Sequence, residues 1–135
     1  MTHHHCIDRQ FQSDNLKDYE REVKSLYAHG GNNFLTAFER IRDIIKQNPG
    51  LEELVIIFVT DGHDCMDCYE HPRGQYAQDL LNVAKQIKEV AGLKTSYMCI
   101  GFSEGHDARQ MNQIANFGSA PGNFMYVPTN VADYQ

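Results

Sequence analysis

The sequence feature that most constrains the fold is the apolar run Leu54–Val59, which ends abruptly in Thr60-Asp61-Gly62. A run that is apolar on both faces is typical of a strand covered on both sides, as in a parallel sheet. An aspartate just past the carboxyl end of such a strand lies where open α/β sheets bind their ligands. Because Asp-Gly is also a common turn signal, the rest of the chain must decide between a site and a simple turn.

The remaining sequence alternates between helical and strand-like segments. Ser13 or Asp14 can cap a first helix that ends near Gly30-Gly31, and Asp107 can cap a short fourth helix. The other expected helices cover about 33–48 and 75–91, and the expected strands cover 54–60, 95–100 and 123–127. This alternation predicts an α/β fold whose parallel sheet carries helices on both faces.

Size and charge exclude several classes of function. With 135 residues the chain is expected to form one domain over 16–135, preceded by a segment of uncertain structure over 1–15. The net charge of −6 offers no basic stripe for nucleic acid. The longest apolar run is far too short to cross a bilayer.

The four cysteines do not resemble a disulfide pattern, so we expect reduced thiols and favour an intracellular location.

Three passages resemble von Willebrand factor type A (VWA) domains. Gly30–Phe38 resembles their Gly-Gly-Thr-Asn-Phe segment, and Val55–Gly62 resembles their fourth strand with its Thr-Asp-Gly turn. Ile100-Gly101-Phe102, followed by Asn112–Ala115 and Gly122–Val127, resembles their last two strands and the helix between them. The resemblance implies a Rossmann-like three-layer sandwich with a mostly parallel central sheet, here incomplete at its amino-terminal end.

The resemblance implies protein binding rather than catalysis. Such domains hold magnesium in a metal-ion-dependent adhesion site built from three loops, and an acidic side chain of the partner completes the coordination. Asp61 occupies the position of the third-loop aspartate, whereas Asn32 replaces the usual second-loop threonine. The Asp-x-Ser-x-Ser pattern of the first loop is missing, so we expect a degenerate site and weak or absent magnesium binding. No enzyme is expected, because Ser103, His106 and Asp107 crowd one loop instead of converging as a triad.

A second chemistry is suggested by the segment between residues 63 and 71. Cys65, Cys68 and His71 have the donor types and close spacing of a zinc site, and His63 could be a fourth ligand. Without a second cysteine or histidine pair the pattern is weakly specific. A zinc-stabilised binding module therefore remains the alternative to an adhesion-type module.

The missing first strand has a structural consequence. In the VWA sheet order 3-2-1-4-5-6, the strand at 54–60 would lose its central neighbour and the helix that covers one face of it. We therefore expect a domain fragment whose exposed sheet edge favours self-association or is capped by residues 1–12.

The zinc alternative predicts a measurable metal content. Zinc held by Cys65, Cys68 and His71 would be stoichiometric in purified protein, and Cys65→Ser would remove it and lower the melting temperature. We expect elemental analysis of the wild-type chain to show no stoichiometric zinc. A melting temperature that falls on both chelation and Cys65→Ser would establish the zinc module instead.

Overall fold

The computed structural model describes residues 15–26, 32–64 and 75–128, and the chain divides into two units, 1–31 and 32–135. The described part of the first unit is helix α1, Leu16–Ser25. Its apolar residues Leu16, Tyr19 and Val23 are exposed, and no residue of α1 is buried. Its N-cap is Asn15, which makes no side-chain cap; the predicted caps at 13 and 14 lie outside the described residues.

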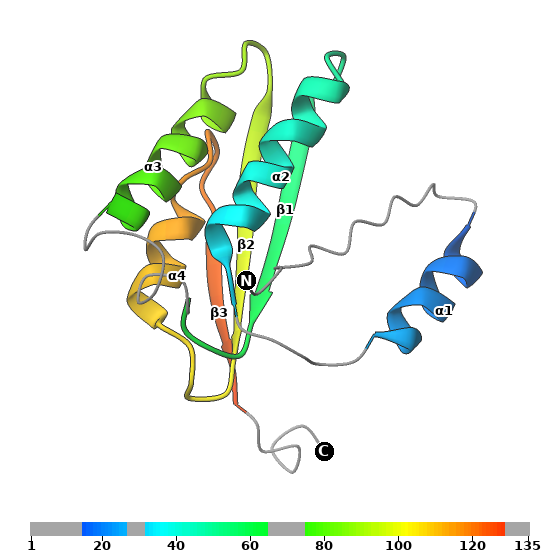
Figure 1. Cartoon of the computed structure of the whole chain (residues 1–135), viewed down its shortest axis with the longest axis vertical. Helices are drawn as coiled ribbons and strands as arrows, with labels where there is room; N and C mark the ends of the chain where they lie inside the picture. The colour runs from blue at the N-terminus through cyan, green and yellow to red at the C-terminus, as the bar shows by residue number, and fades with distance from the viewer. Residues whose placement is uncertain (1–14, 27–31, 65–74, 129–135) are drawn as a thin grey trace, which may run out of the picture. The chain divides into compact units, whose positions relative to one another are not determined.

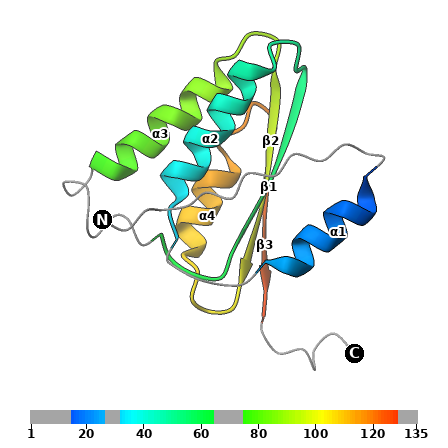
Figure 2. The same ribbon diagram turned by 45° about the vertical axis from the view of Figure 1, so that its right-hand side comes forward.

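The second unit is an α/β layer structure. Its elements are α2 (Phe34–Gln47), β1 (Glu53–Thr60), α3 (Gln75–Lys88), β2 (Lys94–Phe102), α4 (Ala108–Ala115) and β3 (Asn123–Val127). The strands form a parallel sheet in the order β1-β2-β3, with Ile57 beside Met98 and Ile100 beside Met125. The predicted α/β class with a parallel sheet is confirmed. Figures 1 and 2 show α2, α3 and α4 together on one side of this sheet.

Local capping explains where the helices begin. Asn33 caps α2 by accepting a hydrogen bond from the Thr36 amide at 3.0 Å. Asp107 caps α4 by accepting from the amides of Arg109 and Gln110, as the sequence predicts. The connection from α3 to β2 contains Gly92 at a φ of 77°, a backbone conformation that glycine adopts without strain. No helix in the described ranges is long and apolar enough to span a bilayer.

The hydrophobic core lies between the three helices and the sheet. Phe38 of α2 is fully buried and lies near the centre of an aromatic cluster with Phe58, Tyr97 and Phe117. Its ring stacks on Tyr97 at a centroid distance of 5.8 Å. The helices contribute further buried apolar side chains, at Leu35, Ile45, Tyr76, Leu80, Val83, Ile87, Met111 and Ile114.

The two faces of the sheet differ. Side chains alternate along β1, so that Ile56 and Thr60 are buried toward the helices while Val55, Ile57 and Val59 are exposed. The expectation that the apolar run is covered on both sides is therefore wrong for the described structure. Within the described residues β1 is an outer strand and one face of the sheet is exposed, as expected for a sheet without the first strand. The expected capping of this edge by residues 1–12 lies outside the described residues.

The packing around Phe38 predicts a large loss of stability on truncation. Phe38→Ala should lower the free energy of unfolding by about 3–5 kcal/mol, because it removes a fully buried ring and leaves a cavity. Leu81→Ala is the matched control, since Leu81 is an exposed apolar residue of α3 and its truncation should cost under ~0.5 kcal/mol. Denaturant unfolding measures both, and equal effects would contradict the described core.

Candidate functional site

Three segments far apart in the sequence meet at the carboxyl edge of the sheet. They are the residues before α2, the turn after β1 and the turn after β2. Asn32, Asp61 and Ser103 from these segments line one open hollow of about 510 Å³, together with Val59, Thr60 and Phe102. The structure thus brings together Asn32 and Asp61, the two residues that the sequence singles out for a metal site. Ser103 joins them, because parallel strands end at the same edge.

Hydrogen bonds tie the three segments to one another. The side-chain amide of Asn32 donates to the His63 carbonyl at 3.0 Å, and the Ser103 hydroxyl donates to the Asp61 carbonyl at 3.2 Å. Two glycines permit this close approach. A Cβ added to Gly62 would lie 2.9 Å from Asn32 Nδ2, and one added to Gly105 would lie 2.8 Å from the Asp61 carbonyl oxygen.

The turns after β1 and β2 hold the backbone on both sides of the exposed Asp61 carboxylate. The Thr60 hydroxyl bonds to both the amide and the carbonyl of Gly62, which closes the turn after β1. Ser103 has a φ of 60°, rare for a residue with a side chain, and its hydroxyl accepts from the Gly105 amide at 3.3 Å. Because Thr60 and Ser103 are used in the turns, the exposed Asp61 carboxylate is the charged group that the hollow presents to solvent.

A second polar cluster beside this hollow was not foreseen from the sequence. Asp64 accepts from the Phe34 amide at 3.3 Å and from the Tyr76 hydroxyl at 2.5 Å. The Tyr76 oxygen in turn accepts from the Leu35 amide at 2.9 Å. With Asn33 bonded to Thr36, side chains satisfy the first three amides of α2. This end of the helix therefore binds its own chain and does not offer those amides to an external anion.

Burial and charge act together on Tyr76. Desolvation raises the pKa of its hydroxyl above the usual value, and the hydrogen bond to Asp64 raises that pKa further. The Asp64 carboxylate also lies at the amino end of α2, where the helix dipole favours negative charge. The cluster thus fixes the segment after β1 against α2 and α3. No sequence spacing indicates it, because it joins residues 30 and 12 positions apart.

Most of the proposed zinc ligands lie outside the residues that the structure describes. Cys65, Cys68 and His71 lie outside the described residues, and of the four proposed ligands His63 alone is described. Its backbone carbonyl accepts the bond from Asn32. Within the described ranges no three histidine, cysteine, aspartate or glutamate side chains are grouped so as to hold a metal ion. The zinc site stays a prediction.

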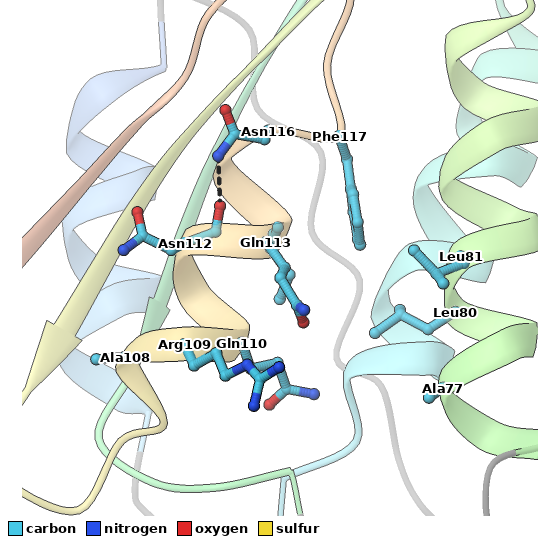
Figure 3. A pocket seen from close by; sticks show the side chains of 11 residues that line it. Ala77, Leu80, Leu81, Ala108, Arg109, Gln110, Asn112, Gln113, Asn116 and Phe117 are labelled. Atoms are coloured by element: carbon cyan, nitrogen blue, oxygen red, sulfur yellow. Dashed lines mark hydrogen bonds between the residues drawn. The ribbon is translucent and has the colours of Figure 1, made fainter.

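A larger hollow of about 820 Å³ lies between α3 and α4 (Figure 3). Leu80 and Leu81 approach it from α3, while Gln110 and Gln113 extend toward it from α4. Asn116 is held at its edge by a hydrogen bond to the Asn112 carbonyl at 2.8 Å. None of its lining residues is acidic, so this hollow offers no carboxylate to a metal ion.

Comparison of the chain with protein-family models, with curated proteins and with solved structures found no match. The interpretation of the carboxyl edge therefore rests on its own geometry and on the sequence resemblance.

Two buried tyrosines provide a matched test of the polar cluster. Tyr76→Phe should lower the free energy of unfolding by about 1–3 kcal/mol, because it leaves the Leu35 amide and Asp64 without their shared partner. Tyr97→Phe should leave stability unchanged or slightly raised, since the buried Tyr97 hydroxyl has no hydrogen-bond partner among the described residues. Denaturant unfolding of both variants makes the comparison. A larger loss for Tyr97→Phe would contradict this assignment.

Proposed function

We propose that the chain is a protein-binding module of the VWA type that contacts its partner at the carboxyl edge of the sheet. The observation that carries the proposal is the shared hollow of Asn32 and Asp61. These residues occupy the positions of two of the three ligand loops in the resembled family. Their convergence is what a VWA-like arrangement requires, and it is not implied by their separation of 29 positions in the sequence.

The composition of the hollow supports contact with a protein. The Asp61 carboxylate and the Asn32 amide lie beside Val59 and Phe102, two exposed apolar side chains at the ends of β1 and β2. Protein interfaces combine apolar contact area with a few polar groups that fix the orientation of the partner. An open hollow at a sheet edge also leaves room for a protruding side chain of that partner.

The metal site of this module is degenerate. Magnesium requires near-octahedral coordination by oxygen atoms. Asp61 and Asn32 offer one carboxylate and one amide oxygen, while the side-chain amide nitrogen of Asn32 is bonded to the His63 carbonyl. We therefore expect partner binding that depends on the Asp61 carboxylate but depends little on magnesium.

The geometry of the neighbouring loop favours binding over catalysis. A hydrolytic nucleophile needs a base within hydrogen-bond reach of its hydroxyl. The Ser103 hydroxyl instead donates to the Asp61 carbonyl, and His106 Nδ1 lies 2.6 Å from the Ser103 backbone oxygen. The His106 ring packs on Tyr126 and Phe124. Ser103 and His106 thus serve to build the loop beside the hollow.

The proposal predicts that Asp61 controls peptide binding. Peptides selected from a random displayed library on the immobilised chain should bind about tenfold more weakly to Asp61→Asn, which keeps the turn but removes the charge. Glu53→Gln is the matched control, because it removes an exposed carboxylate at the opposite end of β1. Calorimetry measures these affinities with and without magnesium.

Three outcomes would contradict the proposal. Equal peptide affinity for Asp61→Asn and wild type would show that the peptide does not bind at the carboxyl edge. Equal losses of affinity in Asp61→Asn and Glu53→Gln would show that the loss comes from the changed net charge of the chain and not from the position of Asp61. Tight magnesium binding that is lost in Asp61→Asn would show a complete adhesion site in place of a degenerate one.

A further inference from the structure

The face of the sheet opposite the three helices is an exposed apolar surface. Large side chains on it keep between 39% and 63% of their area exposed, which is unusual for a parallel sheet. These side chains are Val55, Ile57 and Val59 of β1, Met98 and Phe102 of β2, and Met125 of β3. We call these six residues the open face.

The strand register makes the open face continuous. Ile57 lies beside Met98, and Val59 lies beside Ile100, which lies beside Met125 on the third strand. Six large side chains with about half of their area exposed form a patch of roughly 500 Å², near the upper limit for a monomeric protein. Patches of this size are often functional, so the open face is a candidate interaction surface.

The open face has one pair of opposite charges and one further carboxylate at its border. Glu53 and Lys94 are neighbours in the register of β1 and β2 and carry opposite charges, while Asp61 lies at the other end of β1 and shares a hollow with Val59 and Phe102. The polar residues within the strands on this face, Ser96 of β2 and Asn123 of β3, are neutral. Glu53, Lys94 and Asp61 together carry a charge of about −1, so most of the chain's net charge of −6 lies elsewhere and two identical faces would repel one another only weakly.

We propose that a second copy of this chain packs on the open face, sheet against sheet, in a symmetric dimer. Two such patches would bury roughly 1,000 Å² in total, which is in the range of weak, transient interfaces. Facing sheets pack with their side chains interdigitated across about 10 Å. The small area makes the dimer reversible and dependent on concentration. Its two-fold symmetry lets one patch serve both copies.

Pairing of two copies through the β1 edge is less favourable than packing of the faces. An antiparallel pair of β1 strands would place Glu53 of one copy opposite Thr60 and Asp61 of the other. Both ends of that edge are acidic, and like charges across a strand pair are destabilising. On the open face Glu53 lies beside the oppositely charged Lys94, which lowers the repulsion between two copies.

Sedimentation of a dilution series tests the dimer. The wild-type chain should change from dimer to monomer on dilution, and Ile57→Asp should remain monomeric throughout the range in which the wild type associates. Leu81→Asp is the matched control, because Leu81 is an exposed apolar residue on α3, away from this face. It should sediment like the wild type. Circular dichroism checks that each variant is folded, and Met125→Gln replaces Ile57→Asp if the latter does not fold.

Methionine oxidation in the wild-type chain tests the same proposal without substitutions. Met98 and Met125 should be oxidised slowly by peroxide at concentrations that favour the dimer and several-fold faster on dilution. Met111 is fully buried in the core and should stay slow throughout, which excludes unfolding.

Several results would overturn the dimer of open faces. A monomer with reactive Met98 and Met125 at all concentrations would show that no second copy covers the face. A monomer with both methionines protected would show that other residues of the same chain cover it. A dimer that Ile57→Asp leaves intact would place the interface elsewhere.

Discussion

The described structure of the second unit depends on one constraint, the burial of a single face of a parallel sheet under three helices. Phe38 lies at the centre of this layer, packed against Phe58 and Tyr97 of two neighbouring strands. Because the connections from β1 to β2 and from β2 to β3 each pass through a helix on the same side, the strands are parallel. Parallel strands end at a common edge, and this is where the candidate site lies.

The polar contacts at that edge join the site to the core. Asp64 and Tyr76 bind the first amides of α2, so the segment after β1 is fixed to the helix that carries Phe38. Asn32 lies just before the N-cap of this helix, and its side chain binds the same segment through the His63 carbonyl. The hollow of Asn32, Asp61 and Ser103 is therefore positioned by a buried network rather than by the turns alone. This rigidity suits a surface that recognises a partner by shape and by one carboxylate.

The open face and the carboxyl edge share two residues. Val59 and Phe102 belong to the open face and also line the hollow at its end. A second copy on the open face would therefore border the proposed binding site and could add contacts to a bound partner. Binding at the two surfaces nevertheless depends on different properties. Binding at the edge depends on the charge of Asp61, whereas packing on the open face depends on its apolar area. A change at Ile57 affects the face without touching the turn that presents Asp61.

The sequence by itself determined the elements and their order. The apolar run 54–59, the cap at Asp107 and the alternation of helical and strand-like segments led to the α/β class and to the parallel sheet, because these signals act over a few residues. The sequence also marked Asn32 and Asp61 through the family resemblance. The sequence did not indicate the structural roles of Ser103 and Asp64. Ser103 was considered only with its neighbours His106 and Asp107, and Asp64 lies within the segment considered for zinc.

Tertiary structure alone decided which groups meet and which face of the sheet is covered. The cluster of Asp64, Tyr76 and the α2 amides forms because three distant segments converge, and no local spacing encodes that convergence. Val55 and Ile56 are both apolar and adjacent, yet Ile56 is buried and Val55 is exposed. The apolar residues of one strand make burial of that strand favourable. Which of its two faces is buried depends on where the helices pack.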